Sequence, residues 1–99
     1  MSVILELTIF PMDKGTSVSP YVAKALGIIR ESGLSHSFGP MGTCIEGSYR
    51  EVMEVVEACF RAVGDDSERV YMNMKLDWRK GRTNGIGGKV RSVEQKLDA

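Results

Sequence analysis

Residues 69–79, RVYMNMKLDWR, alternate between apolar and polar side chains over nine positions. A period of two is typical of a β-strand with one buried face and one polar face. The apolar face carries Val70, Met72, Met74, Leu76 and Trp78. The polar face carries Tyr71, Asn73, Lys75 and Asp77. We therefore expect a strand that packs its methionines into a core and turns its polar row to the other side of a sheet.

A second strand pattern lies at the start of the chain, where residues 2–10 read SVILELTIF. One face of this strand is wholly apolar and consists of Val3, Leu5, Leu7 and Ile9. After it the period changes to that of a helix, which we expect over residues 20–32, with Gly33 as its terminator. The chain between the first strand and the strand at residues 70–78 is therefore expected to begin with a helix.

A second helix is predicted after Ser48, because Glu51 stands three residues later and completes a capping box. Its apolar stripe continues to Gly64. Before this helix, two short extended segments at residues 34–38 and 42–46 are separated by a turn that contains glycine and proline. We expect these two segments to form a hairpin.

The chain closes with a glycine-rich loop at residues 80–88 and a short helix at residues 89–97. Val90, Val93 and Leu97 fall on one side of that helix. The order is thus β-α-β-β-α-β plus a C-terminal helix. This order predicts one α+β domain over residues 1–99, in which a ferredoxin-like antiparallel sheet carries two helices on one face.

The composition bounds the possible functions. Thirteen basic residues balance thirteen acidic ones, so no overall charge favours nucleic acid or an anionic membrane as a partner. The chain has two cysteines and one histidine, and these indicate neither a disulfide framework nor a metal site. No apolar run reaches the length of a membrane span. We expect a cytoplasmic protein without metal or cofactor.

The sheet face opposite the helices has a mixed character. It is expected to display Ile4, Glu6, Thr8 and Phe10 of the first strand beside Tyr71, Asn73, Lys75 and Asp77 of the last. A broad face of this kind suits association between subunits, since exposed apolar surface usually marks an interface. We expect a homodimer or homotetramer formed through this open face.

Three hydroxyls precede the first helix. Ser19 stands before Pro20, which suits the start of a helix, so Ser19 is predicted to be the N-cap. Thr16 and Ser17 are not needed for that cap, and they lie between a strand and a helix N-terminus, where ligands can meet free backbone N–H groups. The alternative is a turn held together by their hydroxyls.

The segment GTCIEG, residues 42–47, supplies a second pair of candidates. Thr43 and Glu46 lie near the ends of a short strand, and the carboxylate could accept hydrogen bonds from an aminopyrimidine or balance a cationic ligand. The alternative for Glu46 is that it favours the positive end of the following helix.

Lys75 and Asp77 share the polar face of the last strand and could pair there or across a subunit interface. Arg79, Lys80 and Arg82 follow as a local basic patch, for which a solvated loop is the simplest interpretation. The glycines at residues 80–88 do not match a phosphate-binding loop. No set of catalytic residues emerges from the sequence.

Taken together, GTSVSPYVAKAL, GTCIEGSYREVMEVVE and KLDWRKGR followed by the segment KVRSV resemble the small thiamine-binding-protein family, also called YkoF-like. The resemblance covers nearly the whole chain in order. It implies a ferredoxin-like fold, sheet-mediated dimers that often pair into tetramers, and binding of thiamine or its hydroxymethylpyrimidine moiety without known catalysis.

The resemblance also implies a binding site. The hydroxyl loop of the family matches Thr16, Ser17 and Ser19, and its GTxxEG strand matches Thr43 and Glu46. Lys75 and Asp77 match the polar end of its last strand and belong to the pocket or to the interface.

The main hypothesis is therefore a small-molecule binding protein and not an enzyme. Two alternatives stay open. One is an enzyme that acts on a small anionic substrate with Lys75 and Asp77 as acid and base, which requires a strongly shifted pKa in a closed pocket. The other is a structural or regulatory oligomer without a ligand.

Overall fold

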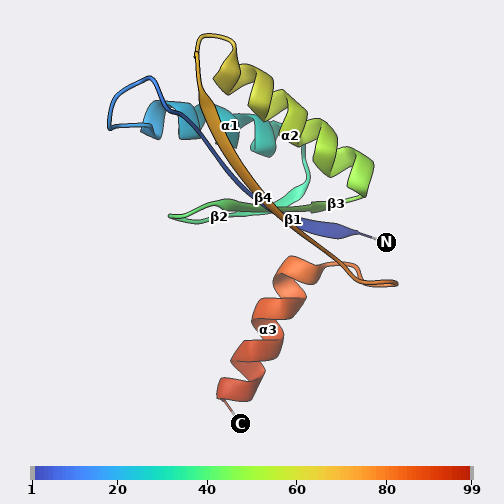
Figure 1. Ribbon diagram of the computed structural model, residues 1–99. Coiled ribbons are helices and arrows are strands. Elements are labelled where there is room, and N and C mark those ends of the chain that lie inside the picture. The colour runs from blue at the N-terminus through green and yellow to red at the C-terminus, as the bar shows by residue number, and fades with distance from the viewer. Residues whose placement is uncertain (1, 99) are drawn as a thin grey trace.

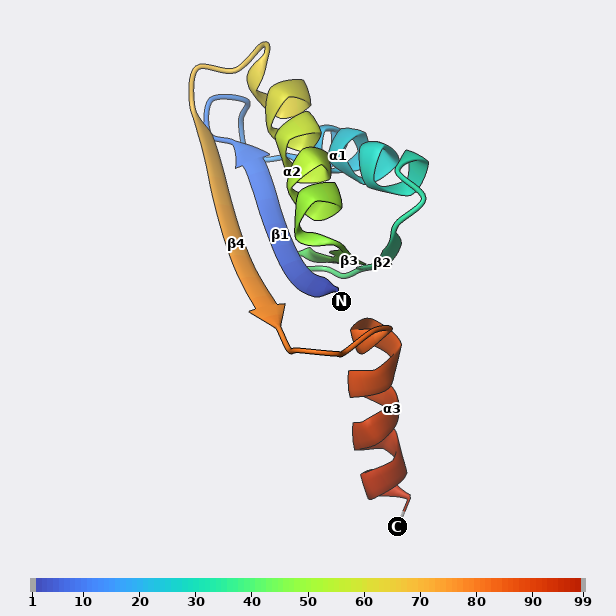
Figure 2. The same ribbon diagram turned by 90° about the vertical axis from the view of Figure 1, so that its right-hand side faces the viewer.

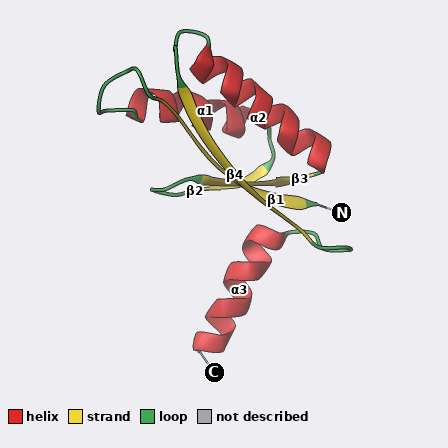
Figure 3. Cartoon of the chain, in the orientation of Figure 1, coloured by secondary structure: helices red, strands yellow, loops and turns green. Residues whose placement is uncertain are grey.

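The computed structural model describes residues 2–98 and has the predicted order of elements (Figure 1 and Figure 3). The elements are β1 (Val3–Pro11), α1 (Ser19–Glu31), β2 (Ser35–Phe38), β3 (Thr43–Gly47), α2 (Tyr49–Gly64), β4 (Val70–Trp78) and α3 (Gly85–Leu97). The strands form one antiparallel sheet in the order β2-β3-β1-β4. This arrangement confirms the ferredoxin-like α+β fold.

The register of the sheet sorts the side chains of β1 onto two faces. Leu5 lies between Ile45 of β3 and Leu76 of β4, and this row faces α1 and α2. Ile4 lies between Glu46 and Asp77 on the opposite, open face. Successive strand residues point to opposite sides, so the apolar alternation of β1 decides which face the helices cover.

The core lies between β1, β3 and the two helices α1 and α2. Both helices lie on the same side of the sheet (Figure 2). The fully buried side chains come from all four elements and include Leu5, Ile29, Ile45, Val52 and Val63. The apolar stripes predicted for the two helices thus meet the apolar face of β1.

One part of the predicted core is not buried. Val70 and Met72 pack against the core, but Met74, Leu76 and Trp78 are 40%, 43% and 52% exposed. β4 is an edge strand, and α1 and α2 pack mainly on β1, β2 and β3. The apolar side chains in the second half of β4 therefore face the helix side of the sheet, but no helix covers them. The prediction that both methionines of this strand are core residues was wrong for Met74.

The two long helices begin in different ways. Ser48 accepts a hydrogen bond from the backbone of Glu51 at 3.1 Å, and the Glu51 carboxylate accepts one from the backbone of Ser48 at 3.0 Å, which confirms the capping box. The predicted cap at Ser19 was wrong. α1 begins one residue earlier, the residue before it is Val18, and no side chain caps the helix. The carbonyl of Val18 already accepts the N–H groups of Tyr21 and Val22, so the turn closes through the backbone alone.

The last helix is longer than expected and leaves the body of the protein. α3 starts at Gly85, within the segment predicted to be a loop, and its first turn packs on the open face of the sheet near Ile4. From there it extends away from the sheet (Figure 1 and Figure 2). The open face is therefore partly covered by the chain itself. None of the helices within residues 2–98 has both the length and the apolar character needed to cross a membrane.

Candidate functional site

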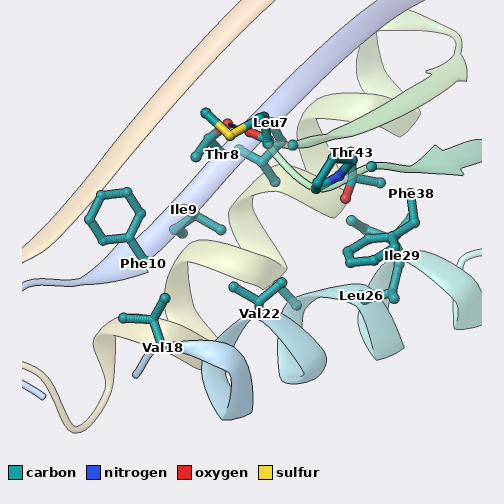
Figure 4. A pocket seen from close by; sticks show the side chains of 15 residues that line it. Leu7, Thr8, Ile9, Phe10, Val18, Val22, Leu26, Ile29, Phe38 and Thr43 are labelled. Atoms are coloured by element: carbon teal, nitrogen blue, oxygen red, sulfur yellow. Dashed lines mark hydrogen bonds between the residues drawn. The ribbon is translucent and has the colours of Figure 1, made fainter. Parts of the chain in front are cut away.

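A pocket of about 240 Å³ lies between β1, α1 and the turn that joins β2 to β3 (Figure 4). Its walls are mainly apolar and include Ile9, Phe10, Val18, Val22, Leu26 and Phe38. In Figure 4 the side chains of Ile9 from β1 and Val22 from α1 point toward one another across this space. The alternation of β1 and the helical period of α1 together place these side chains on facing surfaces.

The turn between β2 and β3 closes one end of the pocket because it lies unusually close to β1. A Cβ atom on Gly42 would come within 2.9 Å of the Thr8 hydroxyl oxygen and 3.2 Å of the Leu7 carbonyl oxygen. The Thr8 hydroxyl donates a hydrogen bond to the carbonyl of Met41 at 2.9 Å. The first glycine of the GTCIEG segment thus allows the turn to contact β1 and form this wall.

Thr43 contributes a polar group to an otherwise apolar lining. Its side chain belongs to the helix-facing row that includes Leu7, and the residue is only 7% exposed. Among the contacts of residues 2–98, its hydroxyl forms no hydrogen bond. A hydroxyl in this position can donate to or accept from a small ligand.

The hydroxyl loop lies beside the same pocket. Val18 lines it, and Ser17 and Ser19 flank Val18 along the chain. Thr16, Ser17 and Ser19 are all exposed. Within the part of the chain that the structure describes, no hydrogen bond holds any of these three hydroxyls, so the turn expected from Thr16 and Ser17 is not held by their side chains.

Glu46 lies on the other face of the sheet from Thr43, because only Cys44 and Ile45 stand between them and side chains alternate along a strand. It is 5% exposed, and both of its carboxylate oxygens accept hydrogen bonds. Oε2 accepts from the hydroxyl of Ser2 at 2.8 Å and from the backbone of Gly85 at 2.6 Å, and Oε1 accepts from the backbone of Ile86 at 3.1 Å. Glu46 therefore caps the N-terminus of α3, and not that of α2 as its place in the sequence suggested.

The environment of Glu46 favours its ionised form. Burial alone would raise the pKa of this carboxyl, but the hydrogen bonds from the backbone of Gly85 and Ile86 and from Ser2 outweigh burial and lower the pKa below its ordinary value. A carboxylate that is ionised at neutral pH thus faces the positive end of α3.

Asp77 forms a second attachment for α3. It accepts hydrogen bonds from Arg82 at 2.9 Å and lies 2.6 Å from the ammonium of Lys89. The hydrogen bonds of Lys89 and Arg82 lower the pKa of Asp77 to about 2. Arg82 therefore belongs to the packing of α3, and not to a free basic patch.

Lys75 forms an ion pair with Glu6 of the neighbouring strand at 3.3 Å, and its side chain is 78% exposed. Neither Lys75 nor Asp77 lies in a closed pocket, and a carboxyl with a lowered pKa is a poor proton donor near neutral pH. The enzyme hypothesis required a strongly shifted pKa in a closed pocket; the pKa of Asp77 is shifted, but both side chains are exposed, so the main support of the hypothesis is lost. Among the described residues, no group of side chains is arranged to hold a metal ion.

The seven candidate residues thus fall on two sides of the sheet. Thr43 and the hydroxyl loop lie at the apolar pocket on the helix side, whereas Glu46, Lys75 and Asp77 lie on the open face. The sequence missed the pocket itself, because the residues that form it look like ordinary core positions. A pocket arises where two apolar faces do not fill the space between them, and no local pattern reports this.

Comparisons with known proteins agree with the fold. A family model described as "Thiamine-binding protein" matches residues 5–94. A UPF0045 protein of Mycobacterium tuberculosis is 38% identical over 98 residues, which cover 98% of this chain and 96% of that protein. A crystal structure of a hypothetical protein from Methanocaldococcus jannaschii matches with a TM-score of 0.87 at 33% identity and covers 94% of this chain and 96% of that one. A Thermotoga maritima protein named as a candidate for thiamine biosynthesis or salvage matches with a TM-score of 0.78 at 20% identity, over 92% and 99% of the two chains, and this likeness shows the fold alone.

Proposed function

The chain belongs to the thiamine-binding protein family, and from this premise we propose that it binds thiamine, or the hydroxymethylpyrimidine moiety of thiamine, without catalysing a reaction on it. The observation that carries the proposal is the apolar pocket between β1, α1 and the β2–β3 turn. This pocket combines aromatic and aliphatic walls with the unpaired hydroxyl of Thr43, the combination that a flat polar ring requires.

The size of the pocket favours a ring over a whole molecule. Its volume of about 240 Å³ lies below the roughly 300–1,000 Å³ of sites for larger ligands. We therefore place the aminopyrimidine ring inside, with its edge toward Thr43. The rest of thiamine, which carries the positive charge, extends toward solvent, because none of the lining side chains is charged.

We assign the ligand contacts to the residues whose hydrogen-bonding capacity is unused. These are Thr43 within the pocket and Thr16, Ser17 and Ser19 in the loop beside Val18. Glu46, Lys75 and Asp77 are each bound to other groups of the chain on the open face. We assign them structural roles, at the base of α3 for Glu46 and Asp77 and at the subunit interface for Lys75.

We also propose that the protein acts as a homo-oligomer in the cytoplasm. The part of the open face that α3 leaves free carries the stacked pair Phe10 and Tyr71, whose ring centres are 5.6 Å apart, beside the ion pair of Glu6 and Lys75. Such a mixed face suits a contact between two sheets. Both cysteines are free thiols, as is usual in a reducing compartment.

Calorimetric titration of the purified protein tests the binding proposal. Thiamine and hydroxymethylpyrimidine should both release heat with one site per chain, and the isolated thiazole half of thiamine should not, because the pocket holds the pyrimidine ring. A folded sample that gives no heat with either pyrimidine compound contradicts the proposal. Binding of the thiazole alone contradicts the orientation.

A further inference from the structure

The apolar pocket lies where β1 loses its strand partner on one side. The pairing of β1 with β3 ends at Leu7, whereas its pairing with β4 continues to Pro11. Beyond Leu7 the pocket lies beside β1, with Thr8 and Phe10 on either side of Ile9 along the strand (Figure 4). The pocket therefore borders a stretch of β1 whose neighbour is a turn and not a strand.

A second cavity, of about 300 Å³, lies on the open face beside the same turn. This cavity, here called the Glu6 cavity, is lined by Glu6 and Thr8 of β1, Met41 of the turn, and Tyr71, Asn73 and Lys75 of β4. Thr8 and Met41 line both cavities, and the Thr8 hydroxyl donates to the carbonyl of Met41. The two cavities are therefore neighbours, and this contact lies between them. Met41 is 84% exposed, so its flexible side chain does not close the passage over the contact.

The two cavities differ in charge. None of the side chains that line the apolar pocket is charged, whereas the Glu6 cavity contains one carboxylate and one ammonium group. These groups, of Glu6 and Lys75, form an ion pair at 3.3 Å, and the two side chains are 41% and 78% exposed. An ion pair between exposed side chains is weak, and the lysine stem is flexible. The Glu6 carboxylate is therefore available to another cation.

An aromatic ring lines the same cavity. The Tyr71 ring stacks on Phe10 with an angle of 29° between the ring planes, and Tyr71 is half exposed. The face of an aromatic ring attracts a cation, because the π electrons make it negative. The Glu6 cavity thus combines a carboxylate and an aromatic ring, two groups that recognise an organic cation.

We propose that the Glu6 cavity is a subsite for the cationic ring of the ligand, with the Glu6 carboxylate beside the positive charge and Tyr71 in contact with the ring. This inference rests on the binding function proposed above, which places the pyrimidine ring in the apolar pocket. It assigns Glu6 the recognition of charge. Among the described side chains that line the two cavities, Glu6 has the only carboxylate.

The geometry of the ligand matches the order of the two cavities. The edge of the pyrimidine ring is directed toward Thr43, which lies opposite Leu7 in the sheet, directly before Thr8. The ring therefore lies at the end of the pocket that adjoins the Glu6 cavity. A single methylene group joins the two rings of thiamine, so the thiazolium ring lies immediately outside the space that holds the pyrimidine.

Lys75 limits the strength of this subsite, because it competes with the ligand for the carboxylate of Glu6. A ligand without a positive charge gains nothing from either residue. The subsite is compatible with the contact between sheets proposed above, since a hollow in one sheet face stays open when a flat face covers it.

Calorimetric titration with three compounds tests the subsite: thiamine, hydroxymethylpyrimidine, and a thiamine analogue with a neutral thiophene ring in place of the thiazolium. Glu6→Gln should weaken thiamine binding by about threefold to fivefold, the scale of an exposed ion pair, and leave both neutral compounds unaffected. Lys75→Met should strengthen thiamine binding by about twofold, since Glu6 loses its competitor. Glu57→Gln is the matched control, because it breaks an exposed ion pair with Arg61 and lines neither cavity.

The wild-type protein provides a test that needs no variant. Thiamine should bind more tightly than the thiophene analogue in low salt, and the difference should shrink as salt is added, because salt screens charges that are partly exposed. Thiamine affinity no higher than that of the analogue in low salt, or equal losses of all three compounds in Glu6→Gln, overturns the subsite. A folded wild-type protein that binds none of the three compounds overturns the binding function itself, so the two failures can be told apart.

Discussion

Oxygen Oε2 of Glu46 lies 2.6 Å from the backbone nitrogen of Gly85, a residue 39 positions further along the chain. This contact joins the third strand of the sheet to the first turn of α3. It explains why a glycine-rich segment is helical, because a buried carboxylate accepts the N–H groups that the first turn leaves free.

We predict that Glu46→Gln destabilises the protein by about 2 kcal/mol, the scale of hydrogen bonds to a buried charged group. The glutamine side chain keeps one oxygen that can accept a hydrogen bond. Its NH₂ group replaces the other oxygen and faces a backbone N–H group, with which it cannot form a hydrogen bond. Urea unfolding and far-ultraviolet circular dichroism should report lower stability and less helix, while thiamine affinity stays within twofold. Glu51→Gln is the control and should change little, because Glu51 accepts with a single oxygen. A loss of binding with unchanged stability would place Glu46 in the ligand site instead.

Acid should weaken the attachment of α3. The pKa of Glu46 lies below its ordinary value of 4.5, and that of Asp77 is lowered from 3.8 to about 2. A lowered folded-state pKa stabilises the fold fully above the ordinary pKa, and this stabilisation is lost as the pH falls through the folded-state pKa. The free energy of unfolding, measured in urea from about pH 6, above the ordinary pKa of both carboxyls, down to about pH 2.5, should decrease below about pH 4.5. The slope should be shallower in Glu46→Gln, and equal slopes would contradict the role of Glu46.

Gly85 and Gly88 should respond oppositely to alanine. A Cβ atom on Gly85 would come within 2.6 Å of Ile4 Cδ1 and 3.1 Å of Glu46 Oε2, so Gly85→Ala should cost about 1–3 kcal/mol by overpacking. A Cβ atom on Gly88 meets no atom within 4 Å, so Gly88→Ala should stabilise α3 by about 0.5–1 kcal/mol. Thermal unfolding measures both changes. A neutral Gly85→Ala would show that α3 does not pack tightly on the sheet.

Alanine should also have different effects at Ser48 and Ser19, the two serines at the starts of the long helices. Ser48→Ala removes a capping hydroxyl and should cost about 1 kcal/mol. Ser19→Ala removes a hydroxyl that caps nothing and should stay within about 0.5 kcal/mol of the wild type. Urea midpoints of the two variants provide the comparison, and equal losses would restore Ser19 as a cap.

Thr43→Val should weaken binding of hydroxymethylpyrimidine by about fivefold to tenfold, since a single neutral hydrogen bond contributes about 1 kcal/mol. The fold should be as stable as the wild type, because the Thr43 hydroxyl has no partner within the described chain to lose. Ser17→Ala should also weaken binding and spare stability. Calorimetric titration and thermal unfolding of each variant separate the two effects, and a variant that loses stability but not affinity contradicts its assignment to the pocket.

Local sequence patterns predicted the order of the elements, the covered face of β1 and the capping box of α2. Each of these depends on residues close together in the chain, whose spacing reports a strand face or a helix end directly. Thr43 and the hydroxyl loop could be named as candidates on the same basis, although the apolar walls of their pocket could not be told from the core.

The partners of Glu46, the start of α3 and the coverage of β4 depend on contacts between segments that are distant in the chain. Glu46 accepts from Gly85 because two distant segments meet on the open face, and Met74 is exposed because α1 and α2 lie over the other strands. A local pattern states which face of an element is apolar. It cannot state whether another element covers that face, because this depends on how the helices pack across the whole sheet.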